Sequence, residues 1–197
     1  MRLVLASRNQ HKLREIVAIL DGLDVELLSV SEFPNVPEVV EDGSSFEENA
    51  AKKAREVAAA TGLPALADDT GLEVDALDGA PGVRSARYAG EPPDYGRNNE
   101  KLVRELSGVG ADGRTARFRC VVALSTPEGR VSTVEGTTVG RILDSPRGDQ
   151  GFGYDPLFLP DGFERTYAEM SPREKNACSH RGKAVRAARG LVEELLR

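Results

Sequence analysis

The sequence has no tryptophan, only two cysteines and no long apolar run. Two cysteines, Cys120 and Cys178, are too few for a disulfide framework, which favours a reducing compartment over an exported protein. The apolar run nearest the N-terminus, Leu3–Ala6, ends at once in polar residues, whereas a signal peptide needs a longer stretch and a membrane span needs roughly 20 apolar residues. We therefore expect a cytoplasmic protein that does not bind membranes.

An excess of positive charge is also missing. The 197 residues carry 26 Lys and Arg against 32 Asp and Glu, a formal net charge of −6. A general nucleic-acid binder draws its affinity from a basic face, so we do not expect nucleic acid as a partner. Hydrophobic residues at 40% and charged residues at 29% are typical of a globular protein, and the length predicts a single domain over residues 1–197. A small basic pocket for a small anion is still compatible with this balance.

Hydrophobic periodicity predicts an α/β protein. Leu3–Ala6 is a short buried strand, and the helix after it carries apolar residues at i, i+3, i+4 and i+7, starting from Leu13. Further helices are expected over 45–61, over 98–106 and after Ser171, and further strands over 64–67, 72–77, 115–125 and 131–139. The last two strands are expected to pair antiparallel across a turn, and the strand over 64–67 is expected to stop at Asp68–Gly71.

Two sequence patterns match motifs whose context does not support the corresponding function. Gly108–Gly113 matches the dinucleotide-binding pattern G-x-G-x-x-G, but it follows a predicted helix and precedes a strand, so we interpret it as a loop. Asp69-Thr70-Gly71 matches the D-T-G of aspartic proteases. Those enzymes need two such aspartates sharing a proton, and the chain has one copy, so a protease would require a dimer.

The segment Ser7–Lys12 joins the first strand to the first helix. Free backbone N–H groups and the helix dipole favour an anion at such a position, and Lys12 adds a cation in the first turn. Ser7 and Asn9 can add neutral hydrogen bonds. The alternative is a plain strand-to-helix turn in which Asn9 caps the helix. The residues leave both interpretations open.

Two adjacent acids, Asp68 and Asp69, lie at the end of a predicted strand. Extended backbone sends neighbouring side chains to opposite faces, so one acid can face a cleft while the other braces the turn. Carboxylates at a strand end suit Mg²⁺, which prefers oxygen ligands, whereas the alternative is an Asx-type turn. Glu41 and Asp42, before the second helix, could complete a metal site, although acids near a helix start usually complement the dipole.

Aromatic and basic side chains gather in two segments nearer the C-terminus. Gly151–Pro156 sets two aromatic residues among glycines, which suits either packing against a planar base or a rigid loop. A basic cluster around the start of the last helix consists of Lys175, His180, Arg181 and Lys183, of which Lys183 best suits a solvated face. Cations at a helix start oppose the dipole, so a phosphate partner explains this cluster better than a solvated face does.

Six motifs follow one another along nearly the whole chain. They are Ser7–Lys12, Phe46–Ala50, Ala67–Leu72, Pro81–Tyr88, Phe152–Pro156 and Ser179–Arg181. Together they resemble the motifs of the inosine triphosphate pyrophosphatase (Ham1-like) family of house-cleaning nucleotide hydrolases. The resemblance implies an α/β fold with a long mixed central sheet flanked by helices, two lobes with a cleft between them, and a homodimer. It also implies Mg²⁺-dependent hydrolysis of dITP, ITP and XTP to the monophosphate and pyrophosphate.

The resemblance also implies roles for individual residues. Asp69 would bind the metal and act as, or position, the base for the attacking water, and Glu41 and Asp68 are further candidate metal ligands. The residues that would contact the nucleotide are Ser7, Arg8, Asn9, Gln10, His11 and Lys12 at the triphosphate, Thr70, and Phe152, Gly153, Tyr154, Asp155, Lys175, His180 and Arg181 around the base. The chain departs from many relatives at Val40, where they carry a second acid, which leaves the second protein ligand of the metal open.

Base choice has a simple hydrogen-bonding logic. Hypoxanthine and xanthine carry an acceptor oxygen at position 6, whereas adenine carries a donor amine, so donors such as His180 and Arg181 would accept the first two bases and mispair with adenine. Two alternatives stay open: a related pyrophosphatase of broader or pyrimidine specificity, and a nucleotide-binding module without catalysis. The pair Asp68-Asp69 favours the enzyme, because a pure binder has less need of it.

Overall fold

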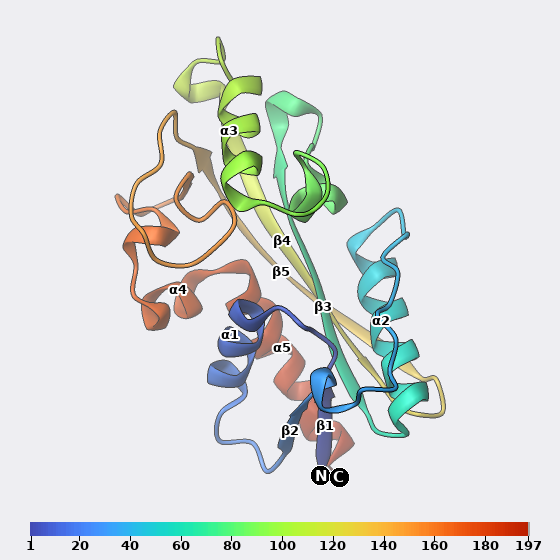
Figure 1. Cartoon of the computed structure of the whole chain (residues 1–197). Coiled ribbons are helices and arrows are strands. Elements are labelled where there is room, and N and C mark those ends of the chain that lie inside the picture. Colours follow the sequence, from blue (N-terminus) through green and yellow to red (C-terminus); the bar gives the residue numbers. More distant parts are fainter. Residues whose placement is uncertain (197) are drawn as a thin grey trace. The chain divides into compact units, whose positions relative to one another are not determined.

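The computed structural model describes residues 1–196, and the chain divides into two compact units. Unit 1 consists of residues 1–69, 120–136 and the segment from Arg181 onward, and unit 2 consists of residues 70–119 and 137–180. The long strands β3 (Ala65–Val74), β4 (Thr115–Ser125) and β5 (Val131–Ile142) carry residues of both units (Figure 1). The expectation of a single domain over residues 1–197 stays a prediction.

The strands form one mixed sheet of six strands in the order β2-β1-β3-β4-β5-β6. In unit 1, β1 (Arg2–Leu5) runs parallel to both β2 (Glu26–Ser29) and β3. In unit 2, β6 (Phe158–Pro160) runs antiparallel to β5. The predicted mixed central sheet of an α/β protein is therefore confirmed, and β4 and β5 are sheet neighbours joined by a turn over 126–130.

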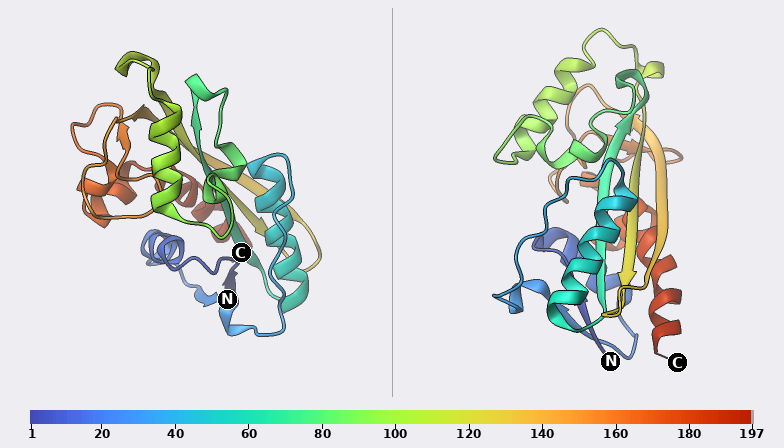
Figure 2. Two further views of the ribbon diagram at one scale, coloured as in Figure 1. Left: turned by 45° about the horizontal axis from the view of Figure 1, so that its top comes forward. Right: turned by 90° about the vertical axis from the view of Figure 1, so that its right-hand side faces the viewer.

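The helices α1 (Gln10–Leu20), α2 (Phe46–Thr61) and α5 (His180–Leu195) pack around the strands of unit 1, with α2 and α5 on opposite sides (Figure 2). α1 forms where the periodicity predicted it, and Leu13, Ile16 and Leu20 of its apolar stripe are buried, whereas Val17, predicted on the same stripe, is 46% exposed. That core consists of Leu3, Leu5, Leu13, Ile16, Leu20, Leu66, Cys120, Val122, Leu124, Ala184, Val185, Ala188 and Val192. Within residues 1–196 no helix has both the length and the apolar character needed to cross a membrane.

Unit 2 has its own core, in which aromatic side chains are prominent. It contains α3 (Tyr95–Glu105) and α4 (Pro172–Cys178). The core residues are Leu72, Val74, Leu102, Leu106, Ala116, Phe118, Ile142, Tyr154, Leu157, Phe158, Tyr167 and Met170. The alternation predicted for β4 therefore supplies both cores, with Phe118 in unit 2 and Cys120 in unit 1.

Several predicted boundaries are wrong. The strand predicted over 72–77 ends at Val74, and Asp75–Leu77 form a short 3-10 helix. β3 runs unbroken from Ala65 to Val74 through Asp68–Gly71, where a stop was predicted, because side chains of other elements hold the acids while the backbone stays extended. The helix predicted from Asn98 begins at Tyr95, because Asp94 caps it by accepting the Arg97 N–H at 2.9 Å. The G-x-G-x-x-G match lies between α3 and β4 and holds only a short 3-10 helix, in agreement with the loop interpretation.

Candidate active site

The turn between β1 and α1 is a capped helix start. Asn9 precedes α1, and its Oδ1 accepts the backbone N–H groups of His11 at 3.0 Å and Lys12 at 3.3 Å. Ser7 Oγ in turn accepts the Asn9 N–H at 3.3 Å. Arg8, Gln10 and His11 of this turn are exposed, and the Arg8 guanidinium donates to the Val36 carbonyl oxygen at 3.0 Å. The cap by Asn9 is confirmed, and phosphate binding at this turn stays a prediction.

Asp68 is the centre of a buried charge network in unit 1. Its Oδ2 lies 2.9 Å from Lys12 Nζ and 3.4 Å from Arg181 Nε, and Arg181 also pairs with Glu15 of α1. Asp68 and Arg181 are 1% and 2% exposed, so these charges depend on one another for compensation. Burial alone would raise the pKa of Asp68, but the cations of Lys12 and Arg181 hold this pKa well below its usual range. Asp68 is therefore a buried counter-ion that links β3 to α1 and α5.

Asp69, the next residue of β3, has a different partner. Asn49 of α2 donates through Nδ2 to Asp69 Oδ2 at 3.0 Å, and Asp69 is buried. Burial raises the pKa of Asp69 above its usual range, the cations of Lys12 and Lys53 oppose this rise, and the Glu41 carboxylate adds to it. The adjacent acids thus serve two environments, as the alternation of an extended strand predicted. Of the two acids, Asp69 is the one whose surroundings favour uptake of a proton.

Glu41 lies in the segment before α2 and forms an ion pair with Lys53. Its charge acts on Asp69, because it contributes to the raised pKa of that residue. Within the part of the chain that the structure describes, no group of three or more His, Cys, Asp and Glu side chains is arranged to hold a metal. Mg²⁺ commonly takes one or two protein carboxylates and completes its shell with water and substrate phosphates, so two carboxylates such as Asp69 and Glu41 would suffice, and binding of the ion by them stays a prediction. Asp68, held by two cations, is a poorer ligand.

In unit 2 the loop Phe152–Asp155 is built around a buried lysine, Lys175. Asp155 Oδ2 lies 2.5 Å from Lys175 Nζ and accepts the Phe152 N–H at 2.9 Å. Lys175 Nζ also lies 4.8 Å from the centroid of the Phe152 ring, so a carboxylate and an aromatic face both compensate this cation. Gly151 permits the close approach, since a Cβ there would lie 2.1 Å from Asp155 Oδ2.

Two hydrogen bonds hold the middle of this loop. Tyr154 donates its O–H to the Ser85 carbonyl oxygen at 2.8 Å, and Asn99 Nδ2 donates to the Gly153 carbonyl oxygen at 3.0 Å. Thr70, also a residue of unit 2, is half-buried in β3. The loop that carries the predicted base contacts is therefore fixed at its backbone as well as at Asp155.

His180 and Arg181 are neighbours at the start of α5, yet they contact different groups. The His180 ring stacks on Phe118, with centroids 4.4 Å apart and an interplanar angle of 13°, and is buried. Arg181 belongs to the network of Asp68. Four of the basic residues predicted to contact the nucleotide are thus held as follows: Lys12 and Arg181 at Asp68, Lys175 at Asp155, and His180 on Phe118. Direct contact of Arg181 with a substrate stays a prediction.

Three residues of this site were not predicted from the sequence: Glu15, Asn49 and Lys53. Glu15 and Lys53 each follow a motif residue, Lys12 and Asn49, by about one helical turn, and that spacing was the available signal. Asn49 lies inside the motif Phe46–Ala50, for which the sequence suggested no role.

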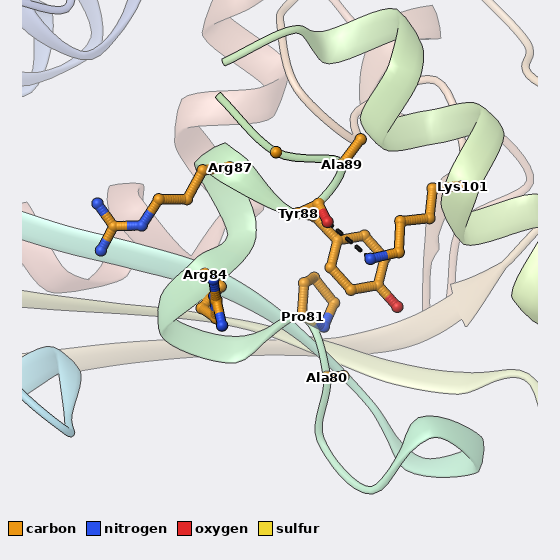
Figure 3. A pocket seen from close by; sticks show the side chains of 8 residues that line it. Ala80, Pro81, Arg84, Arg87, Tyr88, Ala89 and Lys101 are labelled. Atoms are coloured by element: carbon orange, nitrogen blue, oxygen red, sulfur yellow. Dashed lines mark hydrogen bonds between the residues drawn. The ribbon is translucent and has the colours of Figure 1, made fainter. Parts of the chain in front are cut away.

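None of the predicted site residues lines a pocket of about 450 Å³ in unit 2. Its lining residues are Ala80, Pro81, Arg84, Arg87, Tyr88, Ala89, Gly90 and Lys101 (Figure 3). Lys101 Nζ donates to the Tyr88 carbonyl oxygen at 2.7 Å and lies 4.1 Å from the centroid of its ring. Ser85 lies in the same segment as Arg84 and Arg87, and its Oγ accepts the N–H of Leu72 in β3 at 2.9 Å. The motif Pro81–Tyr88 therefore packs against β3 and α3 of unit 2.

The fold and these side chains define a class. The chain is an α/β protein with a lysine-bearing strand–helix turn and a buried aspartate of raised pKa in unit 1, and an aromatic loop around a buried lysine in unit 2. The Ham1 family model matches residues 3–191, and the chain belongs to the Ham1 family.

Individual relatives cover almost the whole chain. The dITP/XTP pyrophosphatase of Geobacter sulfurreducens is 59% identical over 184 residues, which cover 93% of this chain and 92% of that protein. The dITP/XTP pyrophosphatase of Desulforamulus reducens is 51% identical over 195 residues, which cover 99% and 97%. Among solved structures, a HAM1 protein from Coxiella burnetii matches with a TM-score of 0.90 and 43% identity over 98% of this chain and 99% of that one.

Proposed function

We propose that the protein is a Mg²⁺-dependent nucleoside triphosphate pyrophosphatase that hydrolyses dITP, ITP and XTP to the monophosphate and pyrophosphate. The observation that carries this proposal is Asp69, a buried carboxylate of raised pKa that interacts electrostatically with Lys12 and Lys53. All three residues belong to unit 1, which also contains the turn between β1 and α1. The names of the two bacterial relatives, at 59% and 51% identity, support the same substrate class.

Release of pyrophosphate as one unit requires water to break the linkage between the α- and β-phosphates, and in this proposal the water attacks the α-phosphorus with pyrophosphate as the leaving group. Asp69 orients this water and accepts its proton, which its raised pKa favours. Ser7, Asn9 and Lys12 bind the triphosphate, and Lys12 and the start of α1 stabilise the negative charge that develops on it. When bound, Mg²⁺ neutralises charge on the leaving pyrophosphate, and Asp69 with Glu41 would hold it.

We assign recognition of the base to residues of unit 2. Phe152 and Tyr154 offer aromatic faces, and Lys175 and His180 offer donors to an acceptor oxygen at position 6. Adenine carries a donor amine at that position, and a buried polar mismatch discriminates strongly. Arg181, also a predicted base contact, is held by Asp68 and Glu15, so in this proposal its first role is to keep Asp68 in place.

The test is an assay with Mg²⁺ and a panel of ITP, XTP, dITP, ATP, GTP and dTTP, in which pyrophosphate and orthophosphate are measured separately. We expect turnover of the first three substrates with pyrophosphate as the product. Absence of turnover on every substrate would leave only a binding module, and orthophosphate as the product would exclude attack at the α-phosphorus. Turnover of dTTP at the rate of dITP would support the broader specificity.

Asp69→Asn provides the matching test of the catalytic residue. We expect kcat to fall about a thousandfold while the thermal unfolding midpoint stays close to that of the wild type, since loss of a general base costs between about 10² and 10⁴ in rate. Asp42→Asn is the matched control, because Asp42 is an exposed acid in the segment before α2 and pairs with Lys52 at 2.6 Å. Its kcat should stay at the wild-type value. A near-wild-type rate for Asp69→Asn would remove Asp69 from the reaction.

The family resemblance also leads us to propose a homodimer that acts in the cytoplasm. Sedimentation equilibrium of the purified chain tests the first part, and a mass of one chain at micromolar concentration contradicts it. Fractionation of the source cells tests the second part.

A further inference from the structure

Asn49 is a buried amide that connects two parts of unit 1. It lies in the first turn of α2, where its own N–H donates to the Ser45 carbonyl oxygen at 3.2 Å, and it is 2% exposed. Its side-chain Nδ2 donates to Asp69 Oδ2 at 3.0 Å, and its Oδ1 accepts the Gly43 N–H at 2.8 Å. The amide therefore links β3 to the segment that precedes α2.

The two partners fix the orientation of this amide. An ionised carboxylate can only accept a hydrogen bond and a backbone N–H can only donate one. If the amide were rotated by 180°, its oxygen would face Asp69 and its NH₂ group would face the Gly43 N–H, so both bonds would be lost. A buried amide that satisfies both partners in one orientation restricts the carboxylate of Asp69 to a single direction.

Gly43 brings the segment of Glu41 close to this amide. A Cβ on Gly43 would lie 2.7 Å from Asn49 Oδ1 and 2.9 Å from Glu48 Cβ, so only glycine permits the observed approach. Glu41 lies just before Gly43 and acts electrostatically on Asp69. One side chain thus sets the direction of Asp69 and holds the segment that carries Glu41.

We propose that Asn49 is a positioning residue of the reaction: it aims the Asp69 carboxylate and keeps the Glu41 segment beside it. The inference rests on the proposed function, because it assigns Asp69 to the chemistry. A group displaced by about 1 Å can lose about a hundredfold in rate, so the expected effect is on kcat.

Asn49→Asp is the sharpest variant, because it keeps the shape and the acceptor for Gly43 but sets a carboxylate oxygen against Asp69 Oδ2. We expect kcat to fall about a hundredfold and KM to change less than about twofold. Asn98→Asp is the matched control: Asn98 is equally buried at 2%, and its Nδ2 donates to the Ala86 carbonyl oxygen at 2.9 Å in unit 2. The control should lose stability and keep kcat within about twofold of the wild type.

A second measurement tests the geometry without activity. In the double variant Asn49→Asp with Asp69→Asn, donor and acceptor exchange places and the hydrogen bond can form again. We expect the double variant to regain most of the unfolding temperature that Asn49→Asp loses, a coupling that a double-mutant cycle measures.

The outcomes separate the two proposals. If the wild-type protein turns over none of the substrates, the proposed function fails, whereas the stability cycle still reports the link between Asn49 and Asp69. If the wild type is active, an Asn49→Asp protein with normal kcat, with a loss confined to KM, or with the same kcat loss as Asn98→Asp overturns the positioning role. Simple additivity in the cycle overturns the geometry on which that role depends.

Discussion

Two buried cations, one in each unit, are compensated by different sets of partners. Arg181 in unit 1 pairs with two carboxylates, Asp68 and Glu15. Lys175 in unit 2 has one carboxylate partner, Asp155, and lies over the aromatic face of Phe152. The first arrangement is a network of alternating charges, and the second is an ion pair set against rings.

Under the proposed function, the difference corresponds to two parts of the nucleotide. In the charge network of unit 1, acids hold the cations in place before a phosphate group binds, although the same acids also oppose its negative charge. Rings with a fixed cation offer a planar surface and a donor of defined direction, which suits a base. The same contrast separates the neighbours Asp68 and Asp69, since cations lower the pKa of Asp68 whereas burial raises the pKa of Asp69.

The largest expected effect in this comparison comes from Asp68→Asn. The substitution leaves the cations of Lys12 and Arg181 buried against each other, so we expect a loss of about 3–5 kcal/mol in the free energy of unfolding. Asp155→Asn is the matched change in unit 2, and we expect a loss of roughly 2 kcal/mol because the ring of Phe152 still faces Lys175. Urea unfolding of both variants measures the difference. A larger loss for Asp155→Asn reverses the comparison.

A smaller effect, on selectivity, is expected from His180→Phe. Phenylalanine keeps the stack on Phe118 but removes both ring nitrogens, so the selectivity for ITP over ATP in kcat/KM should fall about tenfold. Lys12→Met is the contrasting change in unit 1, and it should slow both substrates by the same factor, since phosphates are common to them. Kinetics with both nucleotides measure the ratio. Equal losses on ITP and ATP for His180→Phe would place its donors away from the base.

Much of the fold followed from local patterns. The stripe that starts at Leu13 defined α1, and Asn9 is the cap that its position before the helix indicated. The strands β2 and β6 were not predicted, because such short segments show no period and neither contains four successive apolar residues, as the segment Leu3–Ala6 at β1 does. The continuation of β3 through Asp68 and Asp69 was not predicted, because aspartates are typical of turns and only partners from other elements keep these two in a strand.

The candidate site likewise has features that the sequence predicted and features that depend on tertiary packing. The motif around Asp69 indicated an acid with a special role, and adjacency in an extended strand indicated that Asp68 would face elsewhere. The bond between Arg181 and Glu15 joins residues 166 positions apart, and no spacing rule reaches that far. Asn49 is likewise separated from Asp69 by 20 positions, and its role depends on how α2 packs beside β3.

The smallest expected effect concerns an exposed acid of unit 2, which contrasts with the buried Asp68. Glu174 lies in the first turn of α4, and its carboxylate accepts both the N–H and the O–H of the capping residue Ser171 at 2.8 Å each. The same carboxylate pairs with Arg165 at 2.7 Å. The Arg165 cation and the bonds from Ser171 lower the pKa of Glu174 from 4.5 to about 2. The ionised form is therefore favoured by folding, so its contribution is complete above pH 4.5 and is lost as the pH falls toward 2. Thermal unfolding between pH 6 and pH 2 should decline less steeply for Glu174→Gln than for the wild type, and identical slopes would show that solvent screens this exposed group completely.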